Sequence, residues 1–161
     1  MLDQLTKLVE QHAGKEIVQN KAIPDQHNQA AIKMVAEQIL SGLKTQASAG
    51  NIQQIAGMFQ GGKASASNPV VSQLIASVAG NVAKKFGIPT QAAQAMAQNL
   101  LPTVMNQLVS KTNDPKDSSF DLGGIMKTVT GNSGFDVSSM LGGKSGGGGL
   151  GDMLGGFLGK K

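Results

Sequence analysis

The two histidines of this chain, His12 and His27, are its only imidazoles and therefore the first candidates for acid–base chemistry. His12 precedes Glu16 by four residues, which is the spacing of neighbours on one helix face, provided that Gly14 does not interrupt the helix. Asp25 stands two residues before His27 at an expected helix start, where an acid favours the helix dipole. Catalysis or metal binding needs a third converging group, and the sequence indicates none. We therefore interpret both histidines as surface or capping residues.

A glycine-rich stretch resembles part of a nucleotide-binding loop. Gly142-Gly143-Lys144-Ser145 matches the end of a P-loop, the loop whose backbone amides cradle phosphate. The full motif needs a glycine where Ser138 stands, and it needs a buried strand before it. Neither is present, so low-complexity glycine is the favoured interpretation.

A second stretch resembles a calcium-binding loop. Asp117, Ser119 and Asp121 alternate like the first three ligands of such a loop. Leu122 and Thr128 occupy the positions that require a glycine and a carboxylate. We expect these acids to be loop and N-cap carboxylates instead.

The residue types that are missing restrict the chemistry further. The chain contains no Cys, Trp, Tyr or Arg. It therefore has no thiolate nucleophile, disulfide or zinc finger, and no guanidinium for bidentate phosphate or guanine contacts. Five phenylalanines are the only aromatic residues, which leaves little for base stacking. We expect no enzymatic activity, no cofactor and no nucleic-acid partner.

The net charge of +4 is unevenly distributed along the chain. Residues 1–60 carry five lysines and five acids, residues 61–113 carry four lysines and no acid, and residues 114–161 carry five of each. Four scattered lysines are few for a nucleic-acid footprint. Lys84 and Lys85 fall near an expected helix C-terminus, where they complement the dipole, and binding of an acidic partner is the alternative.

The elements that must position all these residues are helices. Residues 68–111 hold two stripes of apolar residues at the i, i+3, i+4, i+7 spacing of one helix face, which predicts a helical hairpin. The stripes are Val71, Leu74, Ile75, Val78, Ala79, Val82 and Phe86, then Ala93, Met96, Ala97, Leu100, Leu101, Val104, Met105 and Leu108.

Local signals set the ends of this hairpin. Asn68 is an expected N-cap with Pro69 at the first helical position, and Gly87 is an expected helix terminator. Thr90 is expected to cap the second helix, and Pro102 falls inside it. Because proline removes one backbone hydrogen bond, we predict a kinked helix near Pro102.

Four further helices are predicted before the hairpin. They cover residues 2–13, 15–20, 25–48 and 52–60, and each carries apolar residues at helical spacing or ends at a glycine or proline. The sequence therefore predicts an all-α fold, a compact bundle of about six helices that forms one domain over residues 1–111.

Residues 112–161 have a different composition and are predicted to form a flexible Gly-rich C-terminal tail. A weak repeat runs through them, and each copy holds one or two helical turns with an apolar face. Repeat 1 is Asp121–Met126, repeat 2 is Asp136–Gly143 and repeat 3 is Gly149–Gly156. Their glycines disfavour isolated helices, so each repeat needs a surface on which to dock.

The last segment of the chain is the candidate interaction site. Its apolar residues recur at helical spacing and precede Lys160 and Lys161, a pattern typical of a partner-docking or interfacial membrane helix. They are Leu150, Met153, Leu154, Phe157 and Leu158. We expect docking on the protein's own core or on a second molecule; a lipid surface is the alternative, weakened by the glycines.

Several short stretches of the chain together form a recognisable pattern. They are Asn68-Pro69-Val70-Val71, Lys85-Phe86-Gly87-Ile88, Leu100-Leu101-Pro102, Ala22-Ile23-Pro24, Ser110-Lys111-Thr112-Asn113-Asp114-Pro115 and Phe120-Asp121-Leu122-Gly123-Gly124. This pattern resembles the YidB-like bacterial proteins, a helical domain family of unknown function, and in particular its Bacteroidetes-type members. The resemblance covers nearly the whole chain and implies a compact all-α fold without catalytic residues.

These observations favour a non-enzymatic interaction or structural protein that self-associates through its C-terminal repeats. One alternative is a membrane-surface or stress-associated factor that uses residues 150–161. A second is a small-ligand binder with a core pocket lined by Met34, Met96 and Met105, although methionine more often fills gaps in a core. With no signal peptide and no apolar run of about 20 residues, we expect a cytoplasmic protein.

Overall fold

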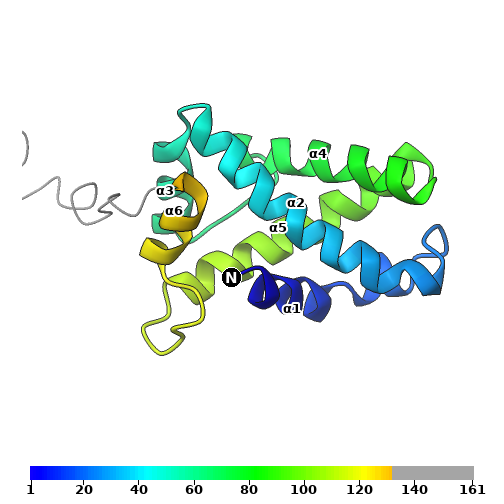
Figure 1. Cartoon of the computed structure of the whole chain (residues 1–161), viewed down its shortest axis with the longest axis horizontal. Helices are drawn as coiled ribbons and strands as arrows, with labels where there is room; N and C mark the ends of the chain where they lie inside the picture. The colour runs from blue at the N-terminus through cyan, green and yellow to red at the C-terminus, as the bar shows by residue number, and fades with distance from the viewer. Residues whose placement is uncertain (132–161) are drawn as a thin grey trace, which may run out of the picture.

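The computed structural model describes residues 1–131, and every regular element in this range is a helix (Figure 1). This confirms the predicted all-α fold for the described residues. The elements are α1 (Leu2–His12), a π-helix η1 (Gly14–Val18), a 3-10 helix η2 (Asp25–His27), α2 (Asn28–Ser48), α3 (Ile52–Gln60), α4 (Pro69–Phe86), α5 (Thr90–Thr112) and α6 (Leu122–Thr130).

The hairpin of α4 and α5 follows the local signals with one exception. Asn68 caps α4, since its Oδ1 accepts a hydrogen bond of 2.9 Å from the backbone N–H of Val70. Gly87 ends α4 in the left-handed conformation, with φ of 63°. Thr90 was expected as the N-cap of α5 and is its first helical residue; Pro89 holds the cap position and no side chain caps this end. A proline before a helix already fixes φ near −65°, which makes the turn without a hydroxyl cap.

Helix α5 continues past Pro102 from Thr90 to Thr112, and the kink stays a prediction. The hairpin supplies a large part of the core, because seven residues of α4 and nine of α5 are buried. In α5 these are Ala93, Met96, Ala97, Leu100, Leu101, Val104, Met105, Leu108 and Val109.

Helix α2 is the centre of the bundle and contacts α1, α4 and α6 (Figure 1). Its buried residues, among them Ile32, Val35 and Ile39, recur at helical spacing and form one broad, mostly apolar face. Where α2 crosses α4, Gly42 lies directly against the Leu74 side chain. The missing side chain at position 42 therefore sets how closely these two helices approach.

The connection between α1 and α2 differs from the prediction. The expected helix over residues 15–20 is a π-helix over Gly14–Val18, in which the amides of Val18 and Gln19 donate to the carbonyls five residues earlier. Ile17 on this turn is fully buried. The wider turn explains the difference, because it places Ile17 in the core directly after α1 has ended at His12.

Packed residues continue past the expected domain boundary at Lys111. Helix α6 lies across the end of the bundle near α3 and packs on α2 (Figure 1). Phe120, Ile125, Met126 and Val129 are all at most 3% exposed. The folded unit therefore includes residues 112–131, and the predicted tail begins inside it. The physical reason is that the apolar face of repeat 1 packs on the bundle, and this packing stabilises a short helix that its glycines would disfavour in isolation.

Candidate interaction surface

The packed form of repeat 1 is the clearest functional feature of the described residues. Asp121 caps α6, because its Oδ1 accepts a hydrogen bond of 2.7 Å from the backbone N–H of Gly124. Ile125, Met126 and Val129 then form a buried face on this nine-residue helix. A helix this short is marginal in water, so burial of that face is what keeps it folded.

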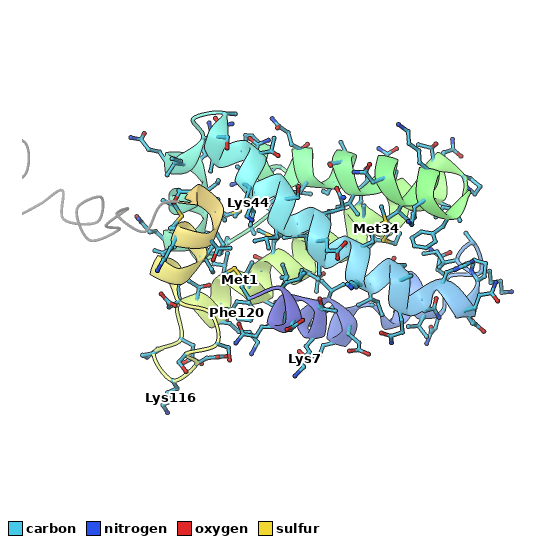
Figure 2. All side chains as sticks on the ribbon, viewed as in Figure 1. Met1, Lys7, Met34, Lys44, Lys116 and Phe120 are labelled. Atoms are coloured by element: carbon cyan, nitrogen blue, oxygen red, sulfur yellow. The ribbon has the colours of Figure 1, made fainter. Side chains whose placement is uncertain are left out.

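Phe120 is part of the same unit, a role that we did not assign from the sequence. It stands immediately before the N-cap and is 3% exposed, and Ile125, four residues after the cap, is 2% exposed. These are the two positions of a hydrophobic staple, which fixes the direction in which a chain enters a helix. Figure 2 shows Phe120 turned toward the bundle, whereas Lys7 and Lys116 extend away from it. The sequence signal was an apolar residue directly before a capping aspartate.

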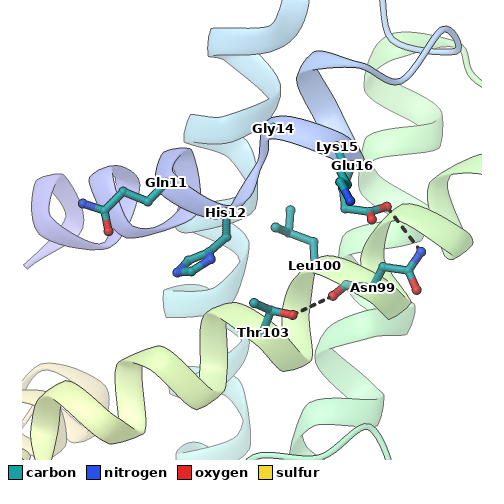
Figure 3. Close-up of a pocket in the computed structure, with 8 residues that line it drawn as sticks. All are labelled: Gln11, His12, Gly14, Lys15, Glu16, Asn99, Leu100 and Thr103. Carbon is teal, nitrogen blue, oxygen red and sulfur yellow. Dashed lines mark hydrogen bonds between the residues drawn. The ribbon is translucent and has the colours of Figure 1, made fainter.

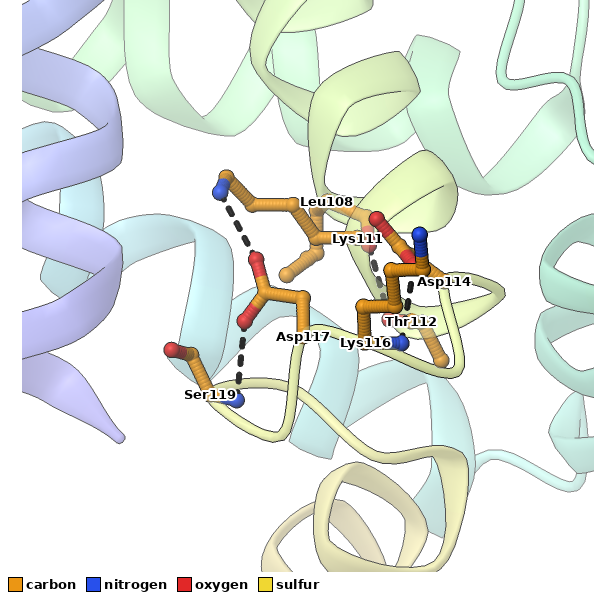
Figure 4. Close-up of polar contacts among 7 residues, drawn as sticks. All are labelled: Leu108, Lys111, Thr112, Asp114, Lys116, Asp117 and Ser119. Carbon is orange, nitrogen blue, oxygen red and sulfur yellow. Dashed lines mark hydrogen bonds and ion pairs between the residues drawn. The ribbon is translucent and has the colours of Figure 1, made fainter.

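The loop that carries α6 is held by polar contacts (Figure 4). The Nζ of Lys111 lies 2.9 Å from Oδ2 of Asp117, and Oδ1 of Asp117 accepts a hydrogen bond of 2.9 Å from the backbone N–H of Ser119. The hydrogen bond from Lys111, followed by those from Ser119, lowers the pKa of Asp117 to about 2. Asn113 also donates to the backbone carbonyl of Phe59 at 2.7 Å. The end of α5 is thereby tied to α3.

The contacts of Asp117 and Asp121 explain the spacing of acids that resembled a calcium-binding loop. Asp117 pairs with Lys111, and Asp121 caps α6, as expected for loop and cap carboxylates. Within residues 1–131, no three His, Cys, Asp or Glu side chains gather where they could hold a metal ion.

The condition for a helical pair of His12 and Glu16, an uninterrupted helix at Gly14, is not met in the structure (Figure 3). Because α1 ends at His12, the chain changes direction before Glu16, whose Oε2 accepts a hydrogen bond of 3.3 Å from Asn99 of α5. His12 and Glu16 both line an open pocket of about 300 Å³. The other residues of this pocket are Gln11, Gly14, Lys15, Asn99, Leu100 and Thr103. The hydroxyl of Thr103 in this pocket donates to the backbone carbonyl of Asn99 at 3.1 Å, not to His12, so the described contacts do not pair this histidine with a nucleophile.

His27 and the core methionines have packing roles. The ring of His27 lies 5.6 Å from that of Phe86, measured between centroids. Met96 and Met105 are 1% and 0% exposed and fill the core, while Met34 packs partly buried at its edge. Four surface pockets of residues 1–131 are lined by other residues, and the methionine-lined ligand site stays a prediction.

The outer surface of the hairpin is almost uncharged. Lys84 and Lys85, in the last turn of α4, are the only charged residues between positions 64 and 110. Amide side chains take the place of ion pairs where α4 meets α2: Asn81 donates to Gln38 at 2.7 Å, and Gln46 donates to Gln73. Depletion of charge is typical of the centre of protein–protein interfaces.

The candidate residues Leu150, Met153, Leu154, Phe157 and Leu158 lie outside the described residues, as do Gly142-Gly143-Lys144-Ser145. No helix within residues 1–131 is long and apolar enough to cross a membrane. Comparisons with protein-family models, with curated proteins and with solved structures found no match to this chain. The resemblance to YidB-like proteins therefore stays a prediction, and the function must be argued from the residues.

Proposed function

We propose that this protein is a non-enzymatic interaction protein whose C-terminal repeats are docking segments that join one molecule to another. The observation that carries this proposal is the packed form of repeat 1. A short, glycine-containing segment becomes a capped helix because its apolar face is buried on α2. Repeat 1 is thus a segment that folds on the surface to which it binds.

Repeats 2 and 3 carry the same kind of sequence, with an aspartate followed by apolar pairs and glycine. The surface of α2 that α6 covers can hold one such segment at a time. The remaining repeats are therefore available to other surfaces, and repeat 3 with its extension to Leu158 is the most apolar of them. A second molecule of the same chain is the partner that we propose.

Light scattering over a range of protein concentrations tests this proposal. The full chain is expected to show masses above the 16.5 kDa of one molecule, increasing with concentration. Serine at positions 150, 153, 154, 157 and 158 is expected to return the mass to that of one molecule, because the apolar face is lost. A full chain that stays at 16.5 kDa throughout would contradict the proposal.

A matched control separates protein docking from lipid binding. Replacing Lys160 and Lys161 with serine removes the terminal charge but leaves every apolar residue in place. Association between protein molecules is expected to persist in this variant. If association instead requires anionic vesicles and is lost with the two lysines, the membrane-surface alternative replaces our proposal.

A further inference from the structure

The surface of α2 under α6, which we call the docking face, has a second candidate occupant within the same chain. In α6 the docked sequence is Phe120-Asp121-Leu122-Gly123-Gly124-Ile125-Met126. Fifteen residues later the chain reads Phe135-Asp136-Val137-Ser138-Ser139-Met140-Leu141. The staple phenylalanine, the capping aspartate and two of the three buried apolar residues, Ile125 and Met126, each have a counterpart in the later segment.

The amino-acid differences between the two segments are compatible with binding to the same docking face. A Cβ at Gly124 would lie 2.6 Å from Oδ2 of Asp121, and one at Gly123 would lie 3.1 Å from Oδ1. Both contacts are with the end of an exposed aspartate side chain, which can turn aside for the serines of the later segment but weakens its capping hydrogen bond when it does so. Serine also has a higher helix propensity than glycine. Against this, Lys144 stands where α6 has the buried Val129, so α6 buries more apolar surface.

The chain is long enough to seat either segment. Helix α5 ends at Thr112, and α6 begins after a loop of nine residues, 113–121. Seating Phe135–Leu141 would instead use residues 113–134 as the loop. Because the cost of loop closure increases only with the logarithm of loop length, the longer loop is a small disadvantage. A tethered segment is also present at an effective concentration of roughly millimolar, which favours it over the same segment from a second molecule.

We propose that Phe135–Leu141 is a second ligand for the docking face and occupies it, within the same molecule, when α6 leaves. This inference rests on the proposed role of the repeats as docking segments and adds the surface that one of them binds. Exchange between the two segments frees repeat 1 for contacts outside its own molecule.

The reactivity of a single engineered thiol tests the exchange, because the full chain contains no cysteine. Met140 corresponds to Ile125, so Met140→Cys places a thiol at the position that becomes buried if the later segment docks. Its rate of maleimide labelling is measured in two full-length proteins, one with unchanged α6 and one with Ile125→Ser and Met126→Ser. Burial excludes the reagent and slows labelling.

We expect labelling to be at least tenfold slower in the protein with the disabled α6. Ser145→Cys, outside the matched residues, is the control and should react equally fast in both proteins. Equal rates for Met140→Cys in the two proteins would overturn the proposal. A slow rate that increases on dilution would also overturn it, since the occupant would then come from a second molecule.

A milder variant covers the case in which the two serines unfold the chain, which circular dichroism would reveal. Asp121→Ala removes the cap of α6 and keeps its apolar face, and we expect at least a twofold slower labelling of Met140→Cys; an unchanged rate would overturn the exchange.

These labelling rates are measured independently of molecular mass. Normal association without any change in labelling refutes the exchange alone, whereas a chain that never associates refutes the proposed function.

Discussion

The hairpin of α4 and α5 and the short helix α6 are built from the same local signals but depend on them differently. Asn68 caps α4 and Asp121 caps α6, and each cap stands before a run of apolar residues at helical spacing. The hairpin helices have 18 and 23 residues with seven and nine of them buried, whereas α6 has nine residues with three buried. The hairpin therefore supplies a large part of the core, whereas α6 contributes a small part of it, and we propose that α6 can detach.

This contrast teaches that the same sequence pattern defines a domain or a detachable segment according to its length and its glycine content. Helices shorter than about 12 residues are marginal without packing. Local opening of such an element costs less free energy than global unfolding, so docking elements are drawn from the least stable parts of a protein.

The largest predicted effect is the loss in the free energy of unfolding when one buried residue is truncated in each region. Leu101→Ala in α5 should lower the free energy of unfolding by about 2–5 kcal/mol, because it leaves a cavity at a fully buried site. Ile125→Ala should cost less, about 1–2 kcal/mol, because α6 can detach and so limit the loss. Urea denaturation followed by circular dichroism measures both. Equal losses would show that α6 is as integral to the core as α5.

The two helix caps give a smaller and more local contrast. Asn68→Ala and Asp121→Ala each remove one side-chain acceptor of a backbone N–H, which typically costs about 1 kcal/mol. For Asn68 we expect the full loss in global stability. For Asp121 we expect faster amide exchange confined to α6, with global stability nearly unchanged. Faster exchange throughout α4 and α5 in the Asp121 variant would contradict a detachable α6.

Much of the fold could be predicted because its signals are local. The apolar periodicity of residues 68–111, the Asn68 cap and the Gly87 terminator each act within a few residues, and the structure has all of them. The packing of α6 could not be predicted from local signals, because its partner α2 lies about 80 residues earlier and the sequence of repeat 1 is too rich in glycine to predict a stable helix alone.

The contacts of the polar residues were equally difficult to predict from local sequence. The spacing of His12 and Glu16 allowed a helical pair only if Gly14 did not interrupt the helix. In the structure α1 ends at His12, and the π-helix that follows directs Glu16 to Asn99 on α5. The role of Phe120 was missed for a related reason. A single apolar residue before an aspartate has meaning only once the following turn is known to be helical and buried.

Replacing a glycine with alanine gives a still smaller effect on stability, and its size differs between the two regions. A Cβ at Gly80 in α4 meets nothing within 4 Å, so Gly80→Ala should stabilise the protein by up to about 1 kcal/mol through helix propensity. At Gly124 the new Cβ displaces the Asp121 carboxylate from its capping position, which offsets the same gain. We expect Gly124→Ala to be close to neutral. Thermal unfolding of the two variants measures the difference, and an equal gain at both positions would show that the cap of α6 adjusts without loss.

The smallest effect concerns the loop between the two regions and its dependence on pH. The hydrogen bond from Lys111 and those from Ser119 hold the pKa of Asp117 at about 2, against an ordinary value of 3.8. A lowered carboxyl pKa adds stability that is complete above about pH 4 and is lost as the pH falls through 2, because protonation breaks the ion pair.

The titration of the Asp117 carboxyl carbon in an NMR experiment should therefore have its midpoint near pH 2, and in Lys111→Met it should move toward 3.8. Because the pair is partly exposed, with 37% of the Lys111 side chain and 21% of the Asp117 side chain accessible, salt should move the midpoint in the same direction. A midpoint near 3.8 in the unaltered chain would mean that the loop does not hold Asp117 in place. Helix α6 would then be tethered to α5 by a looser connection than its contacts indicate, which would widen the difference between the hairpin and α6.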